Sequence, residues 1–338
     1  MQKSIKIIDT TLRDGSHAVS HSFTPEQVKA IAGGLDAAGV DLIEITHGDG
    51  LAGSSINYGF SEHPELELIR AASEVVKNAK LTVLLLPGIG TIEDLEMARD
   101  AGATAVRIAT HCTEADIAIQ HIRYAKEHGM FTVGFLMMVH MTSPEELAKQ
   151  ALVFEEAGAD YINLADSAGH LLPNEVRARV KAVREAVKIP VGFHAHNNLG
   201  VAVANSLAAA EEGAQYLDAT LRGLGAGAGN AQSEVLAAVL NRAGFETKAD
   251  FNTLMDVAAE FVDPVMKRPQ VIFNDAITIG YAGVYSSFLL HARNAAETYG
   301  VNAREILVEL GKRRMVGGQE DMIIDVAHEI ALQQGQTN

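Results

Sequence analysis

The sequence predicts an α/β protein, a (β/α)8 TIM barrel followed by a helical C-terminal region. Eight short runs rich in Val, Ile and Leu alternate with longer segments of helical periodicity, which is typical of parallel βαβ units. Similar segments, among them EAGAD, DAGAT and EEGAQ, recur before successive strands, as expected for one turn reused around a ring. The strand pattern fades after about residue 230, where helical patterns take over.

The predicted strands and helices follow one another in regular order. We expect strands at 5–11, 41–46, 81–86, 105–110, 132–139, 161–166, 191–195 and 216–221. We expect helices at 24–38, 64–77, 91–101, 114–128, 143–157, 174–187 and 201–212, several of them followed by a glycine. Eight such units suit a closed barrel, and an open doubly wound sheet is the main alternative.

The chain has 338 residues, more than the roughly 250 of a typical barrel. We therefore assign residues 1–262 to a catalytic barrel and residues 263–338 to an α-helical C-terminal region. Beyond the last strand we expect helices at 251–263, 283–300, 302–313 and 319–334, with an irregular connection at 263–278.

The composition excludes several classes of protein. Hydrophobic residues make up 48% of the chain and charged residues 21%, which predicts a folded core. A net charge of -16 argues against nucleic acids and anionic membranes as partners. The single cysteine, Cys112, excludes a disulfide framework. We find neither a signal peptide nor a run of about 20 apolar residues, and we expect a cytoplasmic protein.

Two histidines at the end of the seventh predicted strand form the strongest candidate site. In GFHAHNN (192–198), His194 and His196 lie on one face of the strand, about 6.6 Å apart along it. Two imidazoles at a barrel mouth can bind one divalent ion, because catalytic groups gather at the C-terminal ends of the strands. A pair of polar residues hydrogen-bonded at a strand end explains the pattern equally well.

The segment after the first strand adds a carboxylate and a cation to this edge. It reads DTTLRDGSH (9–17), in which Asp14 offers a hard oxygen ligand and Arg13 a bidentate cation for a carboxylate or enolate. The alternative is an Arg–Asp surface turn. Two histidines and one carboxylate suit manganese, cobalt, iron(II), zinc or magnesium better than calcium.

Other polar residues near strand ends are weaker candidates. Asp166 and Ser167 follow the sixth strand, as substrate or supporting contacts or as a structural turn. Glu44 and Arg107 lie within strands and could form an ion pair in the barrel mouth. His47 is interpreted as a solvated loop residue.

A glycine-rich segment after the eighth strand resembles a dinucleotide fingerprint. GLGAGA (223–228) matches its spacing, but such a fingerprint opens a βαβ unit, and no further strand follows here. We interpret 223–230 as a loop that lines the end of the eighth strand.

Several motifs resemble one enzyme family. DTTLRDGSHA (9–18), FHAHNNLG (193–200) and GLGAGAGNA (223–231) resemble the metal-dependent aldolase and acyltransferase barrels, which include isopropylmalate synthase, homocitrate synthase and hydroxymethylglutaryl-CoA lyase. LLLPGIGT, ADSAGH and YSSFLLHA are most similar to the 4-hydroxy-2-oxovalerate aldolases, so the resemblance covers nearly the whole chain.

This resemblance implies a class II aldolase that reversibly cleaves 4-hydroxy-2-oxopentanoate to pyruvate and acetaldehyde in the meta-cleavage degradation of aromatic compounds. It implies that Asp14, His194 and His196 bind the divalent metal, with Mn²⁺ favoured and Co²⁺ or Mg²⁺ as alternatives. Arg13 would stabilise the pyruvate enolate, and His17 would be the catalytic base. Tyr285 would act near the C4 oxygen. The substrate-binding residues that the family implies are Arg13, Leu84, Leu86, Ser167 and Tyr285.

The resemblance also implies a partner, an acylating acetaldehyde dehydrogenase that receives the aldehyde through a channel in a hetero-oligomer. The C-terminal region would cover the active site and dock this dehydrogenase. One alternative is an acyl-CoA-dependent condensing enzyme or lyase on the same barrel, although the helical tail argues against the β-containing regulatory domain of the synthases. The other is a non-catalytic scaffold subunit, against which the complete set of site residues argues.

Overall fold

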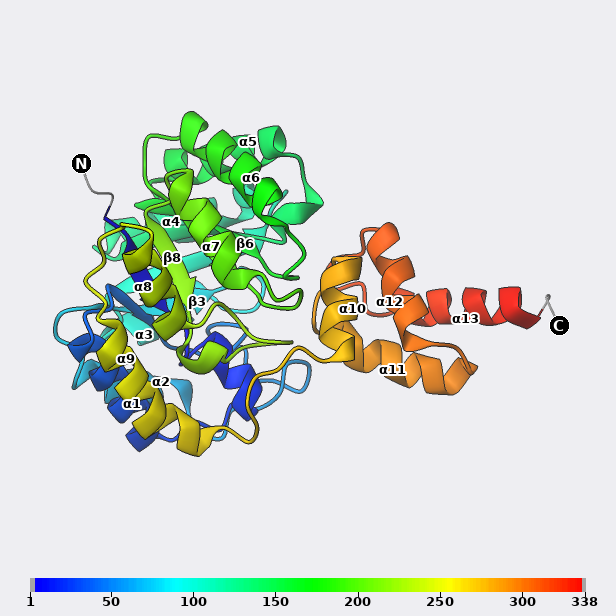
Figure 1. Cartoon of the computed structure of the whole chain (residues 1–338), viewed down its shortest axis with the longest axis horizontal. Helices are drawn as coiled ribbons and strands as arrows, with labels where there is room; N and C mark the ends of the chain where they lie inside the picture. The colour runs from blue at the N-terminus through cyan, green and yellow to red at the C-terminus, as the bar shows by residue number, and fades with distance from the viewer. Residues whose placement is uncertain (1–3, 336–338) are drawn as a thin grey trace.

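The computed structural model describes residues 4–335 and contains a closed barrel of eight parallel strands surrounded by helices (Figure 1). The first and last strands pair with each other, with Ile8 opposite Asp218. This closure confirms the predicted barrel and excludes the open doubly wound sheet. The strands are β1 (Lys6–Asp9), β2 (Leu42–Glu44), β3 (Lys80–Leu85), β4 (Ala105–His111), β5 (Phe131–Met137), β6 (Tyr161–Asp166), β7 (Val191–Ala195) and β8 (Tyr216–Ala219).

One helix follows each strand on the outside of the barrel. Three of these helices begin at a Thr or Ser whose side chain accepts a hydrogen bond from the first turn, namely Thr24, Thr91 and Ser143. The eight helices are α1 (Pro25–Ala37), α2 (Glu65–Ser73), α3 (Ile92–Asp100), α4 (Ile119–Glu127), α5 (Pro144–Ala157), α6 (Pro173–Ala186), α7 (Ala202–Glu211) and α8 (Ser233–Arg242).

Some predicted boundaries are wrong. The first strand ends at Asp9 and not at residue 11, because the Asp9 carboxylate accepts a hydrogen bond from the Thr11 N–H and the chain turns there. A 3₁₀ helix, Asp14–Val19, follows this turn. The second helix also ends early, at Ser73.

The chain continues beyond the barrel as helices α9 (Phe251–Val257), α10 (Asn274–Ala282), α11 (Phe288–Tyr299), α12 (Ala303–Lys312) and α13 (Met322–Gly335). The last three confirm the predicted helices, whereas the irregular connection predicted at 263–278 is wrong in its second part because α10 begins inside it. Among residues 4–335, no helix is long and apolar enough to cross a bilayer.

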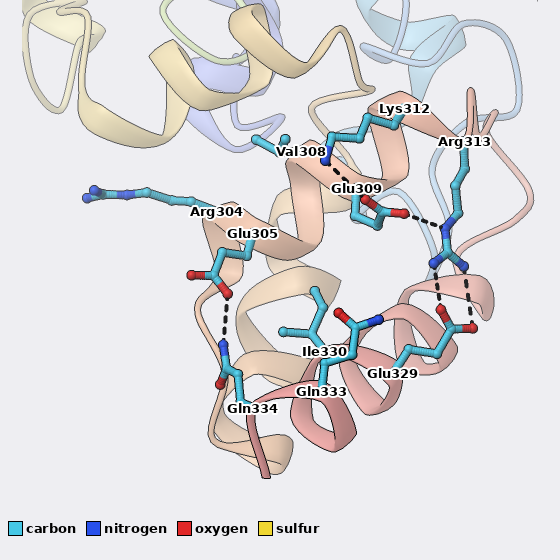
Figure 2. A pocket seen from close by; sticks show the side chains of 10 residues that line it. All are labelled: Arg304, Glu305, Val308, Glu309, Lys312, Arg313, Glu329, Ile330, Gln333 and Gln334. Atoms are coloured by element: carbon cyan, nitrogen blue, oxygen red, sulfur yellow. Dashed lines mark hydrogen bonds and ion pairs between the residues drawn. The ribbon is translucent and has the colours of Figure 1, made fainter. Parts of the chain in front are cut away.

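Helices α10–α13, which we call the tail, stand to one side of the barrel (Figure 1) and enclose a core of their own. A surface groove runs between α12 and α13, and Figure 2 shows Arg313 reaching Glu309 on its own helix and Glu329 across the groove. The tail therefore has internal contacts independent of the barrel. Its fully or almost fully buried aliphatic and aromatic residues are Ile279, Val284, Phe288, Ile306, Leu307, Leu310, Ile323 and Val326.

The packing of α5 on β5 leads to a test of the barrel core. Phe154 lies over Gly134, and a Cβ atom added at Gly134 would stand 2.2 Å from the Phe154 ring. We expect Gly134→Ala to lower the free energy of unfolding by about 1–3 kcal/mol, because the overpacked ring and strand must shift. Urea denaturation measures the change. Gly317→Ala is the control, since a Cβ atom there meets nothing within 4 Å; equal stability of the two variants would contradict this packing.

Candidate metal centre

Three buried side chains converge at the C-terminal ends of the strands. Asp14 begins the 3₁₀ helix after β1, His194 lies on β7, and His196 follows β7 directly. The Asp14 Oδ2 atom lies 3.5 Å from the Nε2 atom of each histidine, and the two Nε2 atoms are 3.2 Å apart. The structure thus brings together the three residues that the sequence singled out as metal ligands.

The spacing of these atoms suits a divalent ion. Ligand atoms about 2.1 Å from a common centre stand roughly 3 to 3.5 Å from one another, as these do. The His194 Nδ1 atom contacts Asp218 Oδ2 at 2.8 Å, so a hydrogen on Nδ1 leaves the Nε2 lone pair directed at the centre. Burial lowers the pKa of His196 to about 4 against the attraction of Asp14, which keeps this imidazole neutral. The donor set therefore fits a cation.

The electrostatic balance of the centre depends on charges around it. Burial alone would raise the pKa of Asp14, but the Arg13 guanidinium and the two imidazoles hold it well below its usual value. Burial alone would lower the pKa of His194, but hydrogen bonds to Asp14 and Asp218 raise it above its usual value. The charged form of Asp14 is thus favoured, and the same contacts favour the protonated form of His194.

Arg13 is fixed beside this centre with one nitrogen uncommitted. Its Nε atom donates to Glu44 at 2.7 Å and its Nη1 atom to Asp14 at 2.9 Å. Within residues 4–335, the buried Nη2 atom has no hydrogen-bond partner. A buried guanidinium N–H without a partner is costly, and an oxygen of a bound anion would satisfy it.

The centre rests on a second set of charges inside the barrel. The predicted ion pair of Glu44 and Arg107 is confirmed, with Oε2 and Nη1 3.4 Å apart. Arg107 also contacts Asp218, a site residue that the sequence analysis did not identify. The alternation of side chains along β8 was the available signal, because it places Asp218 on the same inward face as Tyr216 and Thr220.

The glycine-rich segment 223–230 is a loop over the centre, as predicted. The Ala226 N–H donates to Asp14 Oδ1 at 3.0 Å. A Cβ atom at Gly225 would lie 2.9 Å from the same oxygen and 2.1 Å from Asn230 Nδ2. Glycine is therefore required where the loop approaches the carboxylate.

His17 lies one 3₁₀ turn after Asp14, at the rim of the centre. Its ring packs directly on Gly48, where an added Cβ atom would stand 2.3 Å from Nε2. His21 and His47 stack nearby, with their ring centroids 3.8 Å apart. The solvated position expected for His47 is wrong, because this residue is only 3% exposed. His17, His21 and Asp49 also have ligand atoms within 4.8 Å of one another.

Three further residues implied by the family, Leu84, Leu86 and Ser167, lie on or directly after β3 and β6. The Ser167 hydroxyl accepts a hydrogen bond from the Met138 N–H at 3.1 Å, which leaves its own hydrogen free to donate. The Asp166 carboxylate accepts from the backbone of His170 and Leu171, so this residue holds a structural turn. The apolar wall beside them consists of Leu84, Leu86, Ala109, Phe135, Met137 and Ala165.

Tyr285 lies where the tail meets the barrel. It packs against both the barrel core and the tail core. Burial raises the pKa of its hydroxyl, and negative charge from Cys112, Glu114 and Glu320 raises it further. The ring therefore lies at the boundary between barrel and tail and is not one of the three converging side chains.

Comparisons with known proteins place the chain in a family. The model of the HMGL-like family matches residues 4–262, and that of the DmpG-like communication domain matches residues 270–332. A 4-hydroxy-2-oxovalerate aldolase from Moorella thermoacetica is 64% identical over 98% of both chains, and one from Carboxydothermus hydrogenoformans is 60% identical over 98% of both. The carboxyl transferase domain of Rhizobium etli pyruvate carboxylase shares the fold, with a TM-score of 0.80 over 98% of this chain and 61% of that one, at 18% identity.

Proposed function

This chain belongs to the 4-hydroxy-2-oxovalerate aldolases of the HMGL-like family, and we propose that its barrel mouth carries out their reaction with a divalent metal held by Asp14, His194 and His196. The enzyme is a carbon–carbon lyase that cleaves 4-hydroxy-2-oxopentanoate to pyruvate and acetaldehyde, in the meta-cleavage degradation of aromatic compounds. The observation that carries the proposal is the convergence of these three ligands beside the unpartnered Nη2 atom of Arg13.

The reaction needs a base and a site for negative charge. His17 removes the proton of the C4 hydroxyl, because imidazole accepts and releases protons near neutral pH. The C3–C4 bond then breaks, acetaldehyde leaves, and the electron pair of the bond remains on the pyruvate fragment as an enolate. Arg13 donates its free Nη2 hydrogens to an enolate oxygen. Water supplies the proton that C3 receives to complete pyruvate, and the proton held by His17 passes to solvent, which restores the base.

The remaining residues orient the substrate. Ser167 donates its hydroxyl hydrogen to the substrate carboxylate, while Leu84 and Leu86 contact the methyl group on the aldehyde side. Tyr285 acts near the C4 oxygen, as its place at the boundary between tail and barrel allows.

The metal supplies Lewis acidity, which stabilises negative charge on the substrate oxygen. The mixed nitrogen and oxygen ligands support Mn²⁺ as the physiological ion, with Co²⁺ or Mg²⁺ as alternatives.

The metal requirement can be tested by chelation. We expect EDTA-treated protein to form no pyruvate from 4-hydroxy-2-oxopentanoate and to recover when Mn²⁺ is added. His196→Ala should lose tight Mn²⁺ binding in calorimetry while its circular dichroism spectrum stays unchanged, because one of three ligands is gone. His291→Ala, at an exposed position on α11, is the control. Full activity of the chelated protein would rule out metal dependence.

The role of His17 can be tested without changing its chemistry. Gly48→Ala would place a methyl group where the imidazole lies, so the ring must move away from the substrate. We expect kcat for cleavage to fall about 10²-fold, the lower end of a general-base contribution. Exchange of the pyruvate methyl hydrogens should fall less, because Arg13 and the metal remain. In the control, Gly33→Ala, the new Cβ atom meets Val75 at an ordinary 3.6 Å. An unchanged kcat for Gly48→Ala would contradict the assignment of His17 as the base.

We further propose that the tail docks an acylating acetaldehyde dehydrogenase, forms a hetero-oligomer with it and transfers the aldehyde directly. The match of residues 270–332 to a communication domain supports a partner for this region. Four large apolar side chains are exposed where the tail leaves the barrel, at Val271, Ile272, Ile277 and Tyr281. Ile277 and Tyr281 are one turn apart on α10 and share a face. An exposed apolar patch of this kind favours a protein interface.

Charge placed in this patch should break the complex. We expect the double variant Ile277→Asp/Tyr281→Asp to elute alone from size-exclusion chromatography after co-expression with the dehydrogenase, and to release free acetaldehyde. Its pyruvate formation without the dehydrogenase should be unchanged. Met97→Asp/Ile117→Asp, at two exposed apolar positions on the barrel, serves as the control. A complex that survives in the tail variant but not in the control would locate the interface elsewhere.

A further inference from the structure

The even-numbered strands place a polar layer inside the barrel. In barrels of this type, four side chains from alternate strands fill each interior layer, usually with branched apolar residues. Here Glu44 on β2, Arg107 on β4, Asn163 on β6 and Asp218 on β8 are joined by hydrogen bonds and are all at most 1% exposed. Arg107 is the only cation among these four.

This layer closes a ring of contacts through the metal centre. Asp14 contacts Arg13, Arg13 contacts Glu44 at 2.7 Å, and Glu44 contacts Arg107 at 3.4 Å. On the other side, Arg107 contacts Asp218. The remaining link runs from Asp218 through His194 back to Asp14. Arg107 is the member that joins the Arg13 half of the ring to the His194 half.

Each of the two carboxylates that contact Arg107 also binds a residue of the metal centre. Glu44 accepts a hydrogen bond from the Nε atom of Arg13, and Asp218 contacts the Nδ1 atom of His194. The Arg107 guanidinium contacts both carboxylates, so its position sets where Glu44 meets Arg13 and where Asp218 meets His194.

The position of Arg107 is itself fixed. Its guanidinium carbon lies 4.4 Å from the centre of the Phe135 ring, which covers it on the side of the metal centre. The same ring contacts the His194 imidazole edge-on at 5.8 Å between centroids. Because the Phe135 ring covers it, Arg107 affects the metal centre only through the carboxylates that it contacts.

We propose that Arg107 is a positioning residue that orients two parts of the site at once: the metal ligand His194 through Asp218, and the enolate-binding Arg13 through Glu44. The proposal rests on the proposed function, because it assumes that the three converging residues bind a metal. Lysine cannot replace Arg107, since one ammonium lacks the planar fork that reaches two carboxylates in different directions. Asn163 offers a matched comparison, because it contacts Asp218 and not Glu44.

The test compares Arg107→Lys and Asn163→Ala with the wild-type full-length enzyme. Two quantities are measured: the Kd of Mn²⁺ by calorimetry without substrate, and the KM of pyruvate for exchange of its methyl hydrogens at saturating Mn²⁺. We expect Arg107→Lys to weaken Mn²⁺ binding about tenfold or more, as for other partners of metal ligands. It should also raise the KM of pyruvate. Asn163→Ala should weaken Mn²⁺ binding and leave this KM unchanged.

The outcomes separate the possible errors. A lower melting temperature of Arg107→Lys with wild-type Kd and KM would overturn the proposal, because a purely structural residue behaves so. A changed Kd with an unchanged KM would overturn the link to Arg13. If Arg107→Lys does not fold, two other variants test the proposal. Unchanged Mn²⁺ binding by Asn163→Ala would overturn the link to His194 through Asp218. An unchanged KM of pyruvate for Glu44→Gln would overturn the link to Arg13 through Glu44. Wild-type protein that fails to bind Mn²⁺ would instead contradict the proposed function.

Discussion

The guanidinium of Arg107, held between Glu44 and Asp218 inside the barrel, is the interaction on which the rest of the site depends. Removing charges from water costs several kcal/mol for each ion, and a well-packed apolar layer would often be as stable or more so. A gain in stability therefore does not explain why this layer is charged. The explanation lies at the barrel mouth, because Glu44 also fixes Arg13 and Asp218 also fixes His194.

The sequence allowed the barrel and the three converging residues to be predicted because both follow from local patterns. Alternation along a strand sets His194 and His196 on one face, and parallel strands bring their ends to one edge. Asp218 was missed because it lies in an apolar strand and its partner Arg107 is 111 residues away. Helix α10 was missed because its sequence, NDAITIGYA, combines β-branched residues with Gly280 and therefore has a low helix propensity. The helix forms because it packs against α12. The positions of Gly48 against His17 and of Gly225 against Asp14 are likewise visible only in three dimensions.

The tail is fastened to the barrel by imidazoles that bind the end of one helix. His170 Nδ1 lies 2.7 Å from the Gly280 carbonyl, and His140 Nε2 lies 3.0 Å from that of Gly283. A carbonyl can only accept, so each ring donates, and each satisfies an oxygen at the C-terminal end of α10. Burial lowers the pKa of His140 to about 3, so it makes this contact as a neutral ring. Tyr285 follows Gly283 by two residues, and these bonds therefore also determine where its ring meets the barrel.

Charge balance explains why such a site attracts a cation. Asp14, Glu44 and Asp218 are three carboxylates in contact with two guanidiniums, so the buried network carries one negative charge when both imidazoles are neutral. Hydrogen bonds to Asp14 and Asp218 raise the pKa of His194 against the effect of burial, so the carboxylates that would attract a cation also favour a proton on this imidazole. A metal binds only the neutral imidazole, so a proton on His194 Nε2 and a divalent ion would compete for one nitrogen. A divalent ion bound there would change the single negative charge of the network into a positive one. In a protein with a net charge of -16, such a local excess would favour the binding of an anionic oxoacid at the barrel mouth.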